Sequence, residues 1–426
     1  MIKKISLQLL ANFSGLIHMF IGTPLILSEY GIELVGLNSA LLIIISIMII
    51  FDLGIPAIAG KEVAQSEKRE RKSVVGKYIN IALYQWIYIF IASFILTSTY
   101  LIMVIDKTTQ IELPFISISI FWGMAIASTA SISIFGNILV SLNRSVYVNY
   151  LRLISTAVII LALLGITFYS LPIQFYYLAY ALATFFTAIV LYRVLKVYSK
   201  LNIRQLFWGI SKTRGDILNL LPQSKYLLYI TANLLLMTNL DKISIALRQS
   251  QSEFAYYYLA SYAYIIPYLL VSSIVSLYYP IFCREYKSRS RTIHFQSLII
   301  ASSAISIVIL LALVQRDFIN YVYVEWIGIE SISNIYELIV IFAIVGIIKL
   351  FSMVFYTSLI ATHNGFKDLS RTLLRLLPFN LVVLLILLIH SSLIYAASAL
   401  LIMEFLLFIS LIKKVLKIRD SLILVR

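Results

Sequence analysis

The chain has 426 residues, of which 61% are hydrophobic and only 12% are charged, and its formal net charge at pH 7 is +15. A soluble globular domain carries about a quarter charged residues, so this composition excludes an ordinary soluble protein. Apolar runs of about 20 residues recur from end to end, and such runs predict helices that cross a membrane, where a helix satisfies its own backbone hydrogen bonds.

The chain begins with MIKK, and an apolar run that reaches Leu27 follows directly. This run is longer than the apolar core of a signal peptide, and no small-residue cleavage site is evident. It therefore predicts a first membrane-spanning helix.

Twelve membrane-spanning helices are expected in all, of which the second is long for a single span. They fall near 5–28, 35–60, 78–104, 114–140, 152–171, 174–196, 223–248, 254–283, 293–314, 336–361, 375–390 and 393–416.

The loops between these spans alternate in charge. Most of the Lys and Arg residues lie on one side, whereas the opposite loops carry acids such as Asp106, Glu112 and Asp317. Because basic loops stay in the cytoplasm, this bias places both termini there. The main inner loops are expected at 61–77, 193–225, 284–291 and 367–375.

Residues 193–225 form a basic stretch with seven Lys or Arg and one acid, Asp216, between two apolar halves of the chain. The stretch predicts an N-terminal six-helix bundle over 1–197, a cytoplasmic basic linker over 198–222 and a C-terminal six-helix bundle over 223–426. A bundle–linker–bundle arrangement is typical of membrane transporters. We expect the two bundles to work by alternating access.

Motifs of enzymes and of cofactor sites are absent from the sequence. It has no GxxxxGK[ST] phosphate loop and no HExxH, and its four histidines are scattered. The single cysteine, Cys283, excludes an intramolecular disulfide and a thiolate metal cluster. We therefore expect no enzyme, no cofactor and no metal. The basic residues follow the membrane loops, so nucleic acid is not an expected partner.

Charged residues inside the expected spans are the candidate functional residues. Each costs a few kcal/mol on insertion, so by default it faces the interior of a bundle. Arg248 closes the seventh span at the outer face. The candidates are Asp52, Asp241, Lys242, Arg248, Lys349 and Glu404.

Four of these candidates need partners. Asp241 and Lys242 are consecutive, so on a helix they point about 100° apart, and we expect each to pair with a group other than its neighbour. Lys242 either reaches the outer interface or lines a cavity. Lys349 lies near mid-depth and pairs either with Glu404 in a structural ion pair or with a ligand.

Other polar residues leave two interpretations open. Asp52, close to Gly54, either caps a broken helix or binds a proton or ion. His18 is more often a hydrogen-bonded core residue than a site. Tyr264 and Tyr268 lie deeper than an interfacial aromatic belt, so they either line a wet cavity that suits sugars or pack between helices.

Two stretches carry a family resemblance. The run DKISI from Asp241, followed by EFAYYYLA from Glu253, resembles Wzx-type flippases of O-antigen and other polysaccharide repeat units. The run FDLG around Asp52 is similar to the same family. The resemblance implies a MATE-like fold, with two six-helix bundles around a central cavity.

The resemblance also implies a substrate and a location. The substrate would be an oligosaccharide on undecaprenyl pyrophosphate, flipped from the cytoplasmic to the periplasmic leaflet of the bacterial inner membrane. The polysaccharide polymerase, the chain-length regulator and membrane lipids would be partners. Lys349, Lys242, Arg248, Tyr264 and Tyr268 would bind substrate. Asp52, Asp241, Glu404 and His18 would couple an ion or cap helices.

Two alternatives remain open at this point. A drug or metabolite antiporter of the MATE type uses the same fold, and a cavity dominated by carboxylates would favour it over a flippase. A polysaccharide polymerase would need a large outer loop, whereas the longest one expected, at 315–336, has about twenty residues.

Overall fold

The computed structural model describes most of the chain, and each regular element in the described part is a helix. The described residues are 10–11, 18–52, 54–67, 69–105, 114–142, 144–199, 210–269, 271, 274–275, 293–329, 335–360, 365–389 and 392–423.

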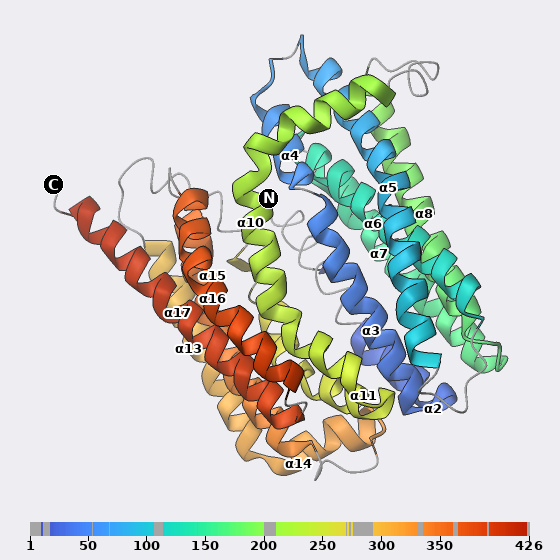
Figure 1. Cartoon of the computed structure of the whole chain (residues 1–426), viewed down its shortest axis with the longest axis vertical. Helices are drawn as coiled ribbons and strands as arrows, with labels where there is room; N and C mark the ends of the chain where they lie inside the picture. Colours follow the sequence, from blue (N-terminus) through green and yellow to red (C-terminus); the bar gives the residue numbers. More distant parts are fainter. Residues whose placement is uncertain are drawn as a thin grey trace. The chain divides into compact units, whose positions relative to one another are not determined.

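Figure 1 shows the helices coloured in chain order. Their bounds are η1 His18–Gly22, α2 Thr23–Tyr30, α3 Ile32–Met48, η2 Ile49–Asp52, α4 Ile55–Gln65, α5 Arg71–Ile105, α6 Phe115–Ser141, α7 Ser145–Phe168, α8 Gln174–Lys196, α10 Ile210–Arg248, α11 Gln251–Ala260, α13 Ile293–Val314, α14 Arg316–Asn320, η3 Tyr321–Trp326, α15 Tyr336–Ile360, α16 Gly365–Ile389 and α17 Leu393–Ile423.

Among the described residues, eight helices are long and apolar enough to cross a membrane, and α3 is a shorter apolar helix. These eight are α5, α6, α7, α8, α13, α15, α16 and α17. The expected spans at 114–140, 174–196 and 336–361 agree with α6, α8 and α15 to within a few residues. Most of 270–283, the second half of another expected span, lies outside the described residues.

The expectation of one continuous helix over 35–60 is wrong. The α-helix ends at Met48, a 3-10 turn follows, and α4 begins at Ile55. Gly54 takes a left-handed conformation with φ +70°, and its N–H donates a 2.8 Å hydrogen bond to Asp52 Oδ1. Pro56, in the first turn of α4, has no N–H to give to a continuing helix. Asp52 therefore caps a break, as one of its two interpretations proposed.

The chain divides into two compact units. Unit 1 comprises Met1–Leu25 and Leu41–Thr231, and unit 2 comprises Ile26–Ala40 and Ala232–Arg426. Helix α10 begins at Ile210, inside the stretch expected to be a linker. The bundle and linker bounds drawn from the sequence stay a prediction.

Helix α6 is the centre of unit 1, where it contacts α4, α5, α7 and α8. Its Trp122 is fully buried, packs edge-on against Tyr177 at 5.5 Å, and donates a 2.9 Å hydrogen bond to the Leu41 carbonyl. The partner for the indole N–H lets so large an apolar side chain stay in the core without an unsatisfied donor. Gly123 then brings α5 close, since a Cβ there would lie 3.3 Å from the Phe90 carbonyl.

Helix α15 has the same central role in unit 2, where it contacts α11, α13, α16 and α17 (Figure 1). Gly346 lies against the helical segment 262–269, and a Cβ at this position would lie 3.1 Å from the Tyr264 Cα. Lys349 is three residues further along, on the same face of α15. The glycine therefore brings the lysine up to the ring of Tyr264.

Gly36 provides a test of packing in unit 2. It lies in α3 against the main-chain carbonyl of Gln251, and an added Cβ would overlap that carbonyl. We expect Gly36→Ala to lower the free energy of unfolding by about 1–3 kcal/mol, because backbone and not a flexible side chain must move. Thermal unfolding in detergent checks this. Gly165→Ala is the control, since its Cβ meets nothing within 4 Å, and an equal loss there would contradict the packing argument.

Candidate functional site

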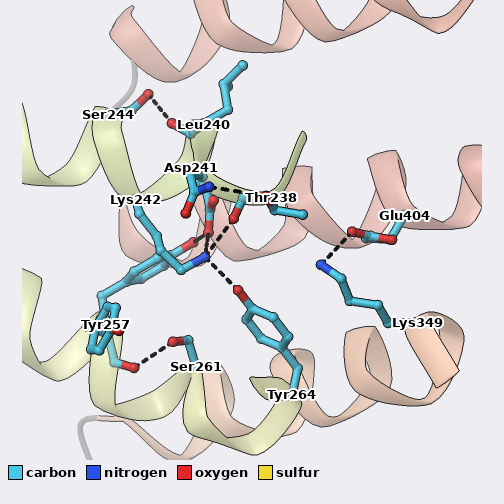
Figure 2. Close-up of polar contacts among 12 residues, drawn as sticks. Thr238, Leu240, Asp241, Lys242, Ser244, Tyr257, Ser261, Tyr264, Lys349 and Glu404 are labelled. Carbon is cyan, nitrogen blue, oxygen red and sulfur yellow. Dashed lines mark hydrogen bonds and ion pairs between the residues drawn. The ribbon is translucent and has the colours of Figure 1, made fainter. Parts of the chain in front are cut away.

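The candidate site of unit 2 is a buried group of charges and tyrosines. Asp241 and Lys242 come from α10, Tyr257 from α11, Lys349 from α15 and Glu404 from α17. Figure 2 shows the Lys242 ammonium directed at the Tyr264 hydroxyl and the Lys349 ammonium directed at Glu404.

The turn between α10 and α11 is fixed by a capping box. Ser250 Oγ accepts from the Glu253 N–H at 3.3 Å, and Glu253 Oε2 accepts from the Ser250 N–H at 3.4 Å. This reciprocal pair satisfies donors at the start of α11 and sets the direction in which it leaves α10. As a result Tyr257 and Tyr264 face back toward Asp241 and Lys242.

Lys349 and Glu404 form a close ion pair. Lys349 Nζ lies 2.8 Å from Glu404 Oε1, and the two side chains are 9% and 2% exposed. The ammonium also lies over two aromatic rings, 5.0 Å from the centroid of Tyr264 and 5.4 Å from that of Tyr268. Of the two partners expected for Lys349, the carboxylate is therefore the one in contact. Desolvated cation–π contacts add about 2 kcal/mol to such a site.

Lys242 is held by three oxygen atoms. Its Nζ donates to the Tyr264 hydroxyl at 2.7 Å and to the Thr238 carbonyl at 2.9 Å, and Asp241 Oδ2 lies at 3.5 Å. The side chain is 3% exposed. Lys242 is therefore buried inside unit 2, which differs from the interpretation in which its ammonium reaches the outer interface. Lining of a cavity by Lys242 stays a prediction.

The expectation that Asp241 would not pair with Lys242 is wrong, because the two form a long ion pair of 3.5 Å. Cβ directions 100° apart do not prevent it, because the lysine stem folds back toward the Thr238 carbonyl one turn earlier, on the side of the carboxylate. The expectation that each residue would find another partner is confirmed. Tyr257 donates a 2.7 Å hydrogen bond to Asp241 Oδ2, and Tyr264 accepts from Lys242.

A cavity of about 260 Å³ in unit 2 opens beside the ion pair. Lys349, Glu404 and the half-buried Tyr268 are in its wall, together with Thr238 and Ser352. The Ser352 hydroxyl is buried and has no hydrogen-bond partner within the described residues. The cavity therefore presents one cation, one anion and an unused hydroxyl to a ligand.

Unit 1 has a cavity of its own, of about 390 Å³. One cation and one acid, Arg152 and Asp52, are in its wall. The other polar lining is almost all hydroxyl, from Thr129, Ser133, Ser155, Thr156, Tyr180, Thr184 and Thr187. Thr129, Thr184 and Thr187 donate to carbonyls of their own helices, so their oxygens serve as acceptors, and such a wall suits a hydroxyl-rich ligand.

Arg152 is the residue that sequence reasoning missed as a site. It stands at the first position of the span expected at 152–171, so it was not among the charged residues expected inside a span. The helix in fact begins at Ser145, so Arg152 lies two turns inside α7, where its side chain is exposed and forms part of the cavity wall. The SVYVNYL run from Ser145, which has no helix breaker, was the signal available in the sequence.

Arg248, His18 and Tyr264 are also among the predicted site residues. Arg248 is the exposed last residue of α10. His18 begins the π-helical segment η1, and its side chain lies outside the described part of the structure. Tyr264 is buried and its ring packs 5.6 Å from Phe342, which agrees with packing between helices. Their roles in binding stay predictions.

No family model matches the chain, and no curated protein matches it. Solved structures do match along nearly its whole length. The lipid II flippase MurJ, in an inward closed conformation, aligns with a TM-score of 0.64 at 15% identity over 100% of this chain and 91% of that one. An inward-facing multidrug resistance transporter of the MATE family aligns with a TM-score of 0.62 at 14% identity, over 98% and 94% of the two chains.

A third match is a MOP superfamily transporter from Pyrococcus furiosus, in which reverse polarity of the binding pocket suggests a different function. It aligns with a TM-score of 0.56 at 13% identity, over 99% of this chain and 96% of that one. At such identities these likenesses show the fold. The chain has the all-α polytopic membrane fold of the MOP superfamily transporters, so the predicted MATE-like fold class is confirmed.

Proposed function

We propose that the chain is a secondary transporter that flips undecaprenyl-pyrophosphate-linked polysaccharide repeat units, of the O-antigen type, from the cytoplasmic to the periplasmic leaflet by alternating access. One observation carries the proposal. Each unit has a cavity with a cation in its wall, Arg152 in unit 1 and Lys349 in unit 2.

Cations in such positions point to an anionic substrate. A charge within a membrane helix costs several kcal/mol and is retained where it serves a transport path or a binding site, and of the two cations Lys349 is buried. A pyrophosphate offers several oxygens to an ammonium or a guanidinium, and these charge-assisted hydrogen bonds are about twice as strong as neutral ones. Arg152 suits phosphate oxygens in pairs, while Lys349 acts as a point charge.

The acids beside these cations have a defined part in the proposal. With no substrate present, Glu404 neutralises Lys349 at 2.8 Å, so the unit keeps no uncompensated charge. An arriving pyrophosphate competes with Glu404 for the ammonium, and its departure restores the pair. Lys242 contacts the hydroxyl of Tyr264 and is paired with Asp241, so its own charge is compensated within unit 2. Asp52, Asp241 and Glu404 are the candidates for coupling transport to protons or ions.

The fold supports transport without ATP. MurJ, which shares the fold, is a lipid II flippase by name, and the sequence lacks the phosphate loop that ATP-driven transporters use. Hydroxyl groups along the wall of the unit 1 cavity add hydrogen-bonding capacity for a saccharide. In this proposal the chain lies in the bacterial inner membrane with both termini in the cytoplasm, and the polymerase and the chain-length regulator receive its product.

A second candidate function is a MATE-type drug or metabolite antiporter. It is favoured by the likeness to multidrug MATE transporters and by the acid in each cavity, Asp52 and Glu404. Drug cations need carboxylates that are free to receive them. Neither cavity is dominated by carboxylates, since each has one acid and one cation in its wall, so the flippase is the better-supported function.

Reconstituted vesicles test the proposal. The purified chain is placed in proteoliposomes with a fluorescent polyisoprenyl-pyrophosphate oligosaccharide, and a membrane-impermeant quencher follows its appearance in the opposite leaflet. We expect protein-dependent movement without ATP, and no exchange of ethidium, a drug cation, for protons or sodium. Vesicles without protein are the control. Ethidium exchange with no lipid movement would overturn the flippase in favour of the antiporter.

A further inference from the structure

Unit 1 carries a second concave surface that the proposed transport path does not use. It is a groove of about 760 Å³ along α5, α6 and α8. Its walls are mostly apolar and aromatic, with Tyr84, Trp86, Tyr88, Phe135, Phe185 and Tyr192 among them. None of the residues in its wall belongs to the cavity that holds Asp52 and Arg152.

The groove is one leaflet deep. On α5 its wall runs from Asn80 to Ile91, a rise of about 16 Å at 1.5 Å per residue. The hydrocarbon core of a bilayer is about 30 Å thick, so this length covers about half of it. The groove lies at the start of α5 and at the end of α8, next to the basic stretches around 61–77 and 193–225, which are predicted to face the cytoplasm.

The open side of the groove is suited to hydrocarbon. Ile87, Tyr88 and Ile91 are 57%, 52% and 52% exposed on a helix long and apolar enough to span a membrane. Trp86 is fixed in the wall, because its ring stacks on Phe90 at 5.4 Å and its N–H donates to Ser128 Oγ at 3.2 Å. A rigid apolar trough at this depth takes a lipid chain in preference to water.

The cytoplasmic end of the groove is basic on both walls. Lys77 lies on the same stripe of α5 as Asn80 and Tyr84, and Lys196 follows Tyr192 by one turn of α8. Lys77 also contacts Glu62, at 3.4 Å, with both side chains 31% exposed, so its ammonium keeps donors for another oxygen. Asn80 Oδ1 is buried and accepts no hydrogen bond within the described residues.

From this arrangement we propose that the groove binds one anionic glycerophospholipid of the cytoplasmic leaflet, of the phosphatidylglycerol class. An acyl chain lies along α5 and α8, and the phosphate lies at the level of Lys77 and Lys196. Basic pockets between membrane helices on the cytoplasmic side bind anionic headgroups by the same electrostatics. The inference does not depend on which substrate the chain transports.

Quenching of Trp86 by brominated lipid tests this inference. The full chain is reconstituted in phosphatidylcholine vesicles that contain increasing fractions of phosphatidylglycerol with brominated acyl chains. We expect quenching at low fractions, and Trp86→Phe should remove that component. Brominated phosphatidylcholine at the same fractions should give no such component. Equal quenching by the two lipids would overturn the proposal, because the headgroup would then have no role.

Two kinds of variant separate the contribution of the lipid headgroup to binding from that of the acyl chain. Each lysine is worth about fivefold in affinity, so Lys77→Gln with Lys196→Gln should weaken phosphatidylglycerol binding about 30-fold. Lys72→Gln with Lys413→Gln, which removes the same charge at exposed positions outside the groove, should leave binding unchanged. Ala188→Phe should fill the groove and abolish quenching with all charges kept. Unchanged binding in the Lys77→Gln and Lys196→Gln variant would refute the proposed lipid site. Displacement of phosphatidylglycerol by an equimolar polyisoprenyl phosphate would refute it as well.

Discussion

Exchange of Lys349 and Glu404 together for alanine is expected to leave a protein that inserts and folds but no longer moves lipid-linked saccharide. The pair is buried, with 2.8 Å between Nζ and Oε1, so its joint removal leaves no uncompensated charge behind. A charge-assisted hydrogen bond to substrate is worth about 1.5–3 kcal/mol, so the loss should be about 10- to 150-fold in transport rate at low substrate. Flipping in proteoliposomes, normalised to folded protein, measures it.

The single variants differ from the double variant in stability. Lys349→Ala leaves Glu404 buried without its partner, which costs about 3–5 kcal/mol, so we expect poor yields of folded protein. Lys349→Arg keeps the charge and should keep much of the transport. The coupling between the two alanine exchanges, read from a double-mutant cycle, then separates the pair's contribution to folding from the lysine's contribution to transport.

A second ion pair in unit 2 provides the matched control. Lys414 Nζ of α17 lies 3.0 Å from Asp368 Oδ1 of α16, with the side chains 34% and 20% exposed and outside the cavity. Lys414→Ala with Asp368→Ala removes the same two charges, and transport should stay at the wild-type level. If the Lys349/Glu404 double variant also transported normally, the lysine would have only a structural part.

The sequence predicted the helices well where hydropathy alone decides, as for α6, α8 and α15. It failed at 35–60, where apolar residues continue through a break in the helix. The break depends on a local hydrogen bond from Gly54 to Asp52 and on the missing N–H of Pro56, and neither changes the hydropathy. The sequence nevertheless allowed the break as one of the two interpretations of Asp52, since Asp52, Gly54 and Pro56 are all residues that stop or start helices.

The sequence predicted which residues belong to the candidate site better than it predicted which of them contact one another. Lys349 and Glu404 were recognised because a charge at mid-depth needs a partner. The contact of Asp241 with Lys242 was excluded wrongly, because spacing along a helix fixes the Cβ directions and not where a four-carbon stem ends. Arg152 was missed because its helix begins a turn or more before the apolar run does.

Arg152 and Asp52 give the prediction that best distinguishes the two candidate functions. Both are in the wall of the same cavity of unit 1, with opposite charges. If an anionic lipid pyrophosphate binds there, Arg152→Gln should weaken its binding about 10-fold or more, because a charged hydrogen-bonding partner is lost. Asp52→Asn should leave binding unchanged or strengthen it, because a repelling carboxylate is gone. The asparagine Oδ1 can still accept from the Gly54 N–H, so the helix break should persist.

A cation antiporter requires the opposite changes in binding affinity. Asp52→Asn should then lose drug binding, and Arg152→Gln should keep or improve it. Arg144→Gln is the control for α7, because Arg144 is exposed directly before the helix and outside the cavity. Equilibrium binding of the labelled pyrophosphate lipid and of ethidium to each variant in nanodiscs measures both changes in affinity in one experiment. Loss of lipid binding in Asp52→Asn, with none in Arg152→Gln, would refute the role assigned to the arginine. A common loss in both variants with unchanged thermal stability would refute a purely electrostatic cavity, because opposite charges act on one anion with opposite signs.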